Sequence, residues 1–193
     1  GDAPISLHSK TNTPTADVTA TVAQIKRLET AGCEIIRVAV PDEAAAEAIA
    51  RIKSQITIPL VADIHFDHRL AIRAARAGAD ALRLNPGNIG GTAEIRAVVD
   101  CARDHGLSIR VGVNAGSLEK DLLARHGGVT PEAMVASAIR HVELLRSMDF
   151  EAVKVSIKAS DVPRTLTAYR LLAARTDLPL HVGVTEAGAL YTG

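Results

Sequence analysis

Four cationic side chains lie inside or directly after short apolar runs of the sequence: Arg37, Arg83, Arg110 and Lys158. A cation in such a run is costly to bury unless an anion accompanies it. Guanidinium groups bind phosphate through paired hydrogen bonds, so a phosphate or diphosphate suits a group of such cations. We therefore expect these residues to bind a phosphorylated ligand. The alternative is that some of them form satisfied ion pairs with Asp63 and Glu186.

Two further residues at the ends of apolar runs could take part in proton transfer. His65 follows Asp63 by two positions, and it could donate to a phosphate or act as a proton donor. Asp63 could fix the tautomer of His65 or pair with an arginine. Glu186 is a candidate general acid or a ligand for a substrate hydroxyl. Packing or capping is the alternative for His65, and ion pairing is the alternative for Glu186.

Two glycine-containing turns, 85–91 and 113–117, contribute Asn85 and Asn114 to the candidate site. Free backbone N–H groups in such turns, directly before a helix, can bind phosphate. Turns between strands and helices also contain Gly and Asn for conformational reasons alone. The other histidines that we considered fall on expected helix faces or loops, and we expect them at the surface: His68, His105, His126 and His141.

The elements that position these residues alternate along the chain. Short β-branched runs and longer Ala-rich amphipathic stretches predict repeated β–α units around a parallel sheet. The expected strands are residues 5–9, 35–40, 59–64, 81–84, 108–113, 153–157 and 179–184. The expected helices are residues 17–31, 44–52, 68–77, 93–105, 131–148 and 162–175.

Polar residues follow nearly every expected strand, which distinguishes two ways of arranging such units. A doubly wound sheet concentrates functional residues at one switch point, whereas a barrel collects all strand ends around one mouth. We therefore predict a TIM-type (β/α) barrel that forms a single domain over residues 1–193. A complete barrel usually needs ~250 residues, so we expect about seven of its eight units here. Another segment or chain would then cover the open sheet edge.

The composition excludes several classes of function. Its 22 basic and 22 acidic residues give no net charge, and aromatic residues make up only 2% with no Trp, so we expect no nucleic-acid partner. No apolar run approaches the ~20 residues of a membrane span, and we expect a cytoplasmic protein. The two cysteines, Cys33 and Cys101, are too few for a metal site made by this chain alone, and we expect buried thiols.

Several unusual strings recur in order along the chain. They are PLVADIHF at 59–66, LRLNPGNIG at 82–90, VGVNAGSLEK at 111–120, KVSIKASD at 154–161 and TEAG at 185–188. Together they resemble signatures of the 4-hydroxy-3-methylbut-2-enyl diphosphate synthase family. The resemblance covers essentially the whole chain.

The resemblance implies a barrel domain that binds 2-C-methyl-D-erythritol 2,4-cyclodiphosphate, and a separate C-terminal domain with a 4Fe-4S cluster. It implies a reductive synthase of isoprenoid biosynthesis by the methylerythritol phosphate route, with ferredoxin or flavodoxin as electron donor and a homodimeric assembly. Glu186 would transfer a proton or orient the substrate. The residues implied to hold the diphosphate and hydroxyls are Arg37, His65, Arg83, Asn85, Arg110, Asn114 and Lys158.

Two departures from the family pattern qualify this expectation. The family's first-strand motif Gln-Ser-Met-Thr-Asn-Thr is replaced by residues 8–13, HSKTNT, in which Lys10 adds a cation. The family binds its cluster through three cysteines and a glutamate of the C-terminal domain, so we expect this chain alone to bind no cluster and to be inactive. The alternatives are a non-catalytic phosphate-binding barrel, a Schiff-base lyase that uses Lys158, and a pterin-type transferase.

Overall fold

The structure is a computed structural model that describes residues 4–183, and these divide into two compact units, 4–109 and 110–183. Each unit repeats the order strand then helix, as expected of a TIM-type α/β fold. No helix of the described residues is both long enough and apolar enough to cross a membrane.

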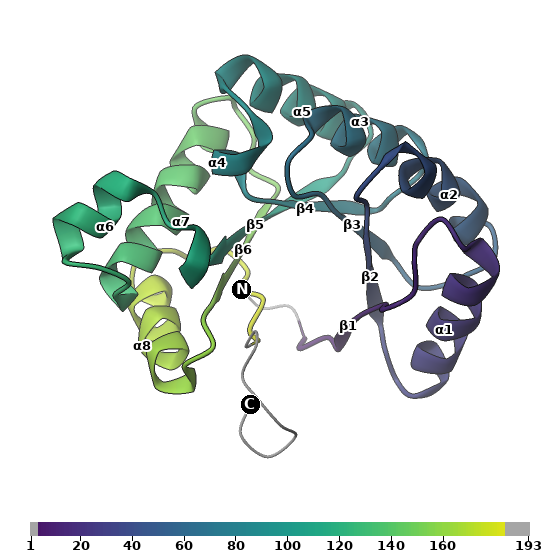
Figure 1. Cartoon of the computed structure of the whole chain (residues 1–193), viewed down its shortest axis with the longest axis horizontal. Coiled ribbons are helices and arrows are strands. Elements are labelled where there is room, and N and C mark those ends of the chain that lie inside the picture. The colour runs from purple at the N-terminus through teal and green to yellow at the C-terminus, as the bar shows by residue number, and fades with distance from the viewer. Residues whose placement is uncertain (1–3, 184–193) are drawn as a thin grey trace. The chain divides into compact units, whose positions relative to one another are not determined.

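The first unit contains four parallel strands in the order β1 (His8–Lys10), β2 (Ile35–Ala39), β3 (Leu60–Asp63) and β4 (Ala81–Leu84). Its helices are α1 (Val18–Thr30), α2 (Glu43–Lys53), α3 (His68–Arg76), α4 (Pro86–Ile89) and α5 (Thr92–Asp104). Figure 1 shows α1, α2, α3 and α5 along one side of these strands. The helices therefore cover one face of the sheet and leave the other face for the side chains of a site.

Local sequence explains why these elements form where they do. Within β2, Ile36 and Val38 are fully buried, so one side of the strand packs into the core. Aspartates precede three helices, and the side chain of each accepts a backbone N–H of the first turn: Asp17, Asp42 and Asp67. Helical spacing then aligns the buried residues on the inner face of each helix.

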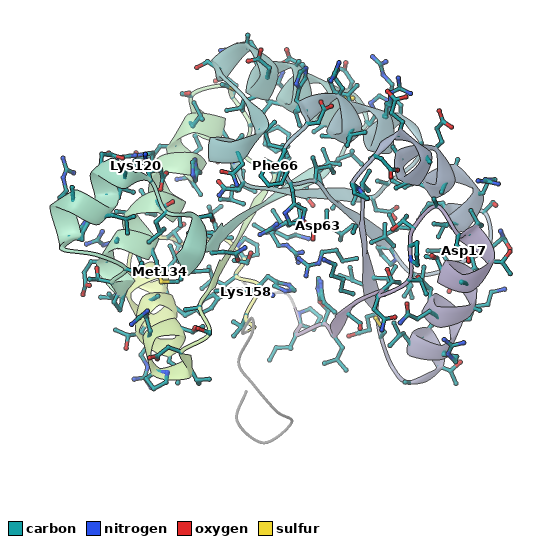
Figure 2. All side chains as sticks on the ribbon, in the orientation of Figure 1. Asp17, Asp63, Phe66, Lys120, Met134 and Lys158 are labelled. Atoms are coloured by element: carbon teal, nitrogen blue, oxygen red, sulfur yellow. The ribbon has the colours of Figure 1, made fainter. Side chains whose placement is uncertain are left out.

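The second unit begins within β5 (Ser108–Asn114) and continues through η1 (Ala115–Ser117), α6 (Lys120–His126), α7 (Pro131–Arg146), β6 (Val153–Lys158) and α8 (Val162–Ala173). Figure 2 labels Lys120 at the start of α6 and Met134 on α7, where Met134 is fully buried. After α8 the chain returns beside β6, and Leu180 forms a parallel bridge with Val155.

Most expected elements are present, and the differences have local causes. The first strand begins at His8 rather than Ile5, because Ile5 and Leu7 are exposed and only residues 8–10 pair with β2. The expected strand 179–184 contains a single bridge in its described part, and residue 184 lies outside the described residues. Neither α4 nor α6 was expected, since both are short and lie in segments that resemble turns.

Candidate functional site

The strand register of the first unit brings four charged residues to the same face of the sheet. Lys10 pairs with Arg37, Ala39 pairs with Asp63, and Asp63 pairs with Arg83. Paired residues of neighbouring parallel strands point to the same side, and so do residues two apart on one strand, such as Arg37 and Ala39. These side chains therefore meet, and Figure 2 labels Asp63 on the side of the strands away from α2 and α3.

Asp63 is the centre of this group, which we call the Asp63 cluster: Lys10, Arg37, Asp63, His65 and Arg83. Oδ2 of Asp63 lies 3.4 Å from both Nζ of Lys10 and Nη1 of Arg37. Oδ1 lies 3.1 Å from Nη1 of Arg83, which donates a hydrogen bond to it, and 3.6 Å from Nε2 of His65. One carboxylate thus holds groups from β1, β2, β4 and the end of β3.

The Asp63 cluster carries more positive than negative charge. The basic side chains of Lys10, Arg37 and Arg83 surround one carboxylate, which leaves an excess of two formal positive charges before His65 is counted. The side chains of Lys10 and His65 are 40% and 48% exposed, so the group is open to solvent on one side. Nε of Arg83 is buried without a hydrogen-bond partner among the described residues. An anion that enters from the open side would supply the missing charge and acceptors.

The pKa values of Asp63 and Arg37 reflect the excess of cations in the Asp63 cluster. Burial alone would raise the pKa of Asp63, but the surrounding cations, Arg83 foremost, outweigh burial and lower it. Burial lowers the pKa of Arg37, and Arg83 lowers it further, although Asp63 acts in the opposite direction. Asp63 is therefore a carboxylate that holds cations in place, and not a proton donor near neutral pH.

Asn85 is placed at the end of β4, where it begins the short helix α4. Its side chain is buried, and its Oδ1 accepts the backbone N–H of Gly87 at 3.1 Å. The N–H of Asn88 donates to the carbonyl of Asn85 at 2.9 Å. Two backbone N–H groups of this turn that could otherwise bind a phosphate are thus used within the turn. The amide nitrogen of the Asn85 side chain is the part that remains suited to a ligand.

In the second unit, Arg110 and Lys158 both lie against the segment of residues 181–183. Arg110 is buried in β5, and its Nη1 lies 2.9 Å from Nδ1 of His181. Lys158 ends β6, and a Cβ built on Gly183 would lie 3.3 Å from its Nζ atom. Figure 2 labels Lys158. Asn114 ends β5, and its carbonyl accepts a hydrogen bond from the hydroxyl of Ser117 at 3.2 Å. Glu186 lies outside the described residues.

His181 is a residue of this site that the sequence analysis did not single out, although the signal was present. Two segments of the sequence share one pattern of residue types: residues 109–113, IRVGV, and residues 180–184, LHVGV. In both, one polar residue interrupts an apolar run two positions before a glycine. A polar residue inside an apolar run is costly to bury without a partner, and this holds for His181 as it does for Arg110.

The structure thus brings the predicted residues together in two groups, one in each unit. Arg37, Asp63, His65 and Arg83 form the first group with Lys10, and Asn85 follows Arg83 at the end of β4. Arg110 and Lys158 form the second group with His181. That all four cations serve one ligand stays a prediction.

The expectation that His141 lies at the surface was wrong. His141 is 5% exposed on α7, and its Nε2 lies 3.1 Å from Oε1 of Glu119, the residue that precedes α6. Burial lowers the pKa of His141, and Glu119 partly opposes this effect. The sequence did not reveal the contact because α6, which brings Glu119 onto α7, was not expected.

Residues 4–183 contain no group of three or more His, Cys, Asp or Glu side chains arranged to hold a metal ion. Both cysteines are free thiols, with Cys33 half-buried and Cys101 buried. Burial raises the pKa of the Cys101 thiol. The cysteines therefore do not fit the role of cluster ligands.

Comparison with known proteins decides the family. Residues 1–193 match the family described as the GcpE TIM-barrel domain. The chain belongs to this family. The GcpE TIM-barrel domain accounts for the strand–helix order of both units.

Curated relatives of this GcpE domain are named 4-hydroxy-3-methylbut-2-en-1-yl diphosphate synthase (flavodoxin). The proteins of Azotobacter vinelandii and Pseudomonas syringae pv. syringae are each 62% identical over 193 residues, and that of Chromohalobacter salexigens is 61% identical. Each alignment covers 100% of this chain and 52% of the relative. The chain thus spans about half the length of the curated relatives it matches.

Solved structures of other families share the fold. Dihydropteroate synthase from Yersinia pestis has a TM-score of 0.61 at 13% identity, over 91% of this chain and 68% of that one. Tryptophan synthase from M. tuberculosis has a TM-score of 0.57 at 21% identity, over 93% of this chain and 72% of that one. At such identities the likeness shows the α/β barrel fold alone.

Proposed function

We propose that this GcpE domain is the substrate-binding barrel of a reductive synthase that converts 2-C-methyl-D-erythritol 2,4-cyclodiphosphate to 4-hydroxy-3-methylbut-2-enyl diphosphate in isoprenoid biosynthesis. The names of the relatives support the reaction. The single observation that supports the ligand class is the excess positive charge of the Asp63 cluster, since a diphosphate is the anion that such a cluster favours.

Each residue of the first unit has a role in this proposal that follows from its position. Arg37 and Arg83 donate to phosphate oxygens, and His65, half exposed beside them, donates to a phosphate or supplies a proton. Asp63 is buried beneath the cations, so it orients their side chains. The amide of Asn85 lies at the end of the same strand as Arg83 and binds a ligand oxygen.

The second unit contributes the remaining candidate residues. Arg110 and Lys158 supply further cations, and Asn114 supplies an amide at the end of β5. The family resemblance assigns proton transfer or substrate orientation to Glu186. Binding by several cations fixes the diphosphate in one position, which is how positioning residues favour a reaction of the attached carbon skeleton.

Reduction in such a synthase uses a 4Fe-4S cluster, which supplies electrons one at a time. The chain has two cysteines, fewer than the three that the resemblance implies for the cluster. We therefore propose the cluster, its domain, a homodimer, a flavodoxin or ferredoxin partner and a cytoplasmic location for a protein that has the length of the relatives. The alternative function is a phosphate-binding barrel without redox activity.

Calorimetric titration with 2-C-methyl-D-erythritol 2,4-cyclodiphosphate tests the proposal. We expect the purified chain to bind it, and the variant Arg37→Gln to bind about 10- to 100-fold more weakly, since a charged hydrogen bond contributes ~1.5–3 kcal/mol. The matched control is Arg73→Gln on α3, because Arg73 is an exposed arginine paired with Glu43 and Glu47. Circular dichroism establishes that each protein is folded.

Three results distinguish the two functions. Loss of binding in Arg37→Gln but not in Arg73→Gln supports the proposed site. Equal binding of inorganic pyrophosphate and the cyclic diphosphate favours the non-catalytic alternative, because a synthase site also recognises the sugar hydroxyls. No binding by the folded chain contradicts the assignment of substrate recognition to these residues.

A further inference from the structure

The contact between Arg110 and His181 fixes the protonation of the imidazole. All nitrogen atoms of a guanidinium are donors or carry no free lone pair, so Arg110 cannot accept a hydrogen bond. The Nδ1 atom of His181, 2.9 Å from Nη1 of Arg110, must then be the acceptor. His181 is therefore neutral in this contact, with its proton on Nε2.

The backbone of His181 is held on both sides. Its N–H donates to the carbonyl of Val155 in β6 at 2.8 Å. Its carbonyl accepts from the hydroxyl of Tyr169 on α8, and that hydroxyl accepts from the N–H of Ile157 at 3.1 Å. Burial raises the pKa of Tyr169 to about 12, so the hydroxyl keeps its proton and remains a donor. Hydrogen bonds to β6 and α8 thus fix the backbone that carries the imidazole.

A neutral partner affects a cation differently from a carboxylate. An imidazole that accepts through Nδ1 orients the guanidinium of Arg110 and itself places no negative charge beside it. Two residues further along, Gly183 leaves room for the amine of Lys158, which a Cβ would approach to 3.3 Å. The segment 181–183 therefore lies against two cations. The ring of His181 contacts Arg110, and the missing side chain of Gly183 leaves space for the amine of Lys158.

We propose that His181 is a positioning residue that holds the guanidinium of Arg110 through its unprotonated Nδ1 atom and so presents that cation to the diphosphate. This role rests on the function proposed above. His181 acts through Arg110 and does not itself contact the ligand. Pre-orientation of a flexible side chain lowers the entropic cost of binding.

The first test needs no ligand. Long-range proton–nitrogen NMR spectra of the whole chain are expected to show His181 as the Nε2–H tautomer. The side-chain resonances of Arg110, identified with Arg110→Lys, are expected to shift and broaden in His181→Leu. A protonated Nδ1 on His181, or Arg110 resonances that do not change in His181→Leu, would overturn the inference whether or not the chain binds a diphosphate.

The second test uses two amides that reproduce different ring nitrogens. The side-chain oxygen of Asn can take the place of Nδ1, whereas the amide of Gln reaches the position of Nε2. In calorimetry with the cyclic diphosphate, we expect His181→Asn to bind like the parent chain and His181→Leu to bind about 3- to 10-fold more weakly. His126→Leu, at the end of α6, is the control for loss of a histidine.

The outcomes separate this inference from the proposed function. Binding that is lost in Arg37→Gln but unchanged in His181→Leu would overturn the inference and leave the function standing. Binding retained by His181→Gln and lost in His181→Asn would show a direct ligand contact through Nε2, and would also overturn it. A parent chain that shows the expected tautomer and Arg110 shifts but binds no diphosphate would refute the function alone.

Discussion

Nη1 of Arg83 lies 3.1 Å from Oδ1 of Asp63, and the two side chains are only 8% and 1% exposed. The same carboxylate has two further cations within ion-pair distance, Lys10 and Arg37. Removal of one partner from a buried pair leaves an uncompensated charge in the interior. The stability of the first unit and its affinity for an anion are therefore both tied to Asp63.

The variant Asp63→Asn is expected to be less stable by about 3 kcal/mol or more, because it leaves three cations together without a counter-charge. Urea unfolding followed by circular dichroism measures the change. The control is Asp67→Asn, whose carboxylate forms an exposed pair with Arg69. Its effect is expected to stay within about 1 kcal/mol. A variant Asp63→Asn as stable as the control would contradict the central role of Asp63.

The lowered pKa of Asp63 predicts a loss of stability in acid. The unfolded chain takes up a proton on this carboxyl near its ordinary pKa of ~3.9, while the folded chain resists protonation to lower pH. The contribution of ionised Asp63 to the free energy of unfolding is complete above that pH and is lost as the pH falls below about 4. Urea midpoints measured from pH 6 to pH 3 should fall more steeply for the parent chain than for Asp63→Asn. Equal slopes would show that other carboxyl groups govern the acid transition.

Buried His141 predicts a second pH dependence, nearer neutrality. Burial lowers its pKa in the folded chain, so the unfolded chain binds the proton first, and stability falls as the pH drops through ~6.5. We expect His141→Gln to lose part of this dependence between pH 7.5 and 5.5, as measured by urea unfolding. Exposed His105 provides the control His105→Gln, which should follow the parent chain. A parental pH slope in His141→Gln would refute this assignment.

The contact of Gly183 with Lys158 predicts an effect on binding without one on stability. In Gly183→Ala the new methyl would approach Nζ of Lys158 to 3.3 Å, and the flexible lysine would move away. We expect the diphosphate to bind about 3- to 10-fold more weakly, the size of one hydrogen bond, with an unchanged melting temperature. The control is Gly183→Ala in a Lys158→Met background, where the added methyl has no amine to displace and should weaken binding no further. If Gly183→Ala binds the diphosphate like the parent chain, Lys158 does not depend on this space.

How far the fold could be predicted depends on the element. The ends of β4 were predicted without error, because an apolar run stopped by Asn85-Pro86 admits few alternatives. The short helices α4 and α6 were missed, since four and seven residues give too little periodicity to recognise. The first strand was predicted to begin at residue 5, because residues 5–7 continue the pattern of a strand. In the structure these residues do not pair with β2, and the strand begins at His8.

The sequence by itself determined that the chain alternates strands and helices and that cations lie within or at the ends of the strands, because periodicity and a polar residue in an apolar run are local properties. The tertiary structure decided which partner each cation meets. Asp63 gathers Lys10, Arg37 and Arg83 from three other strands, and Arg110 meets His181 although 71 residues separate them in the chain. Burial of His141 was decided in the same way. The physical reason is that an ionic contact depends on distance and solvent exclusion in three dimensions, which strand register and helix packing set.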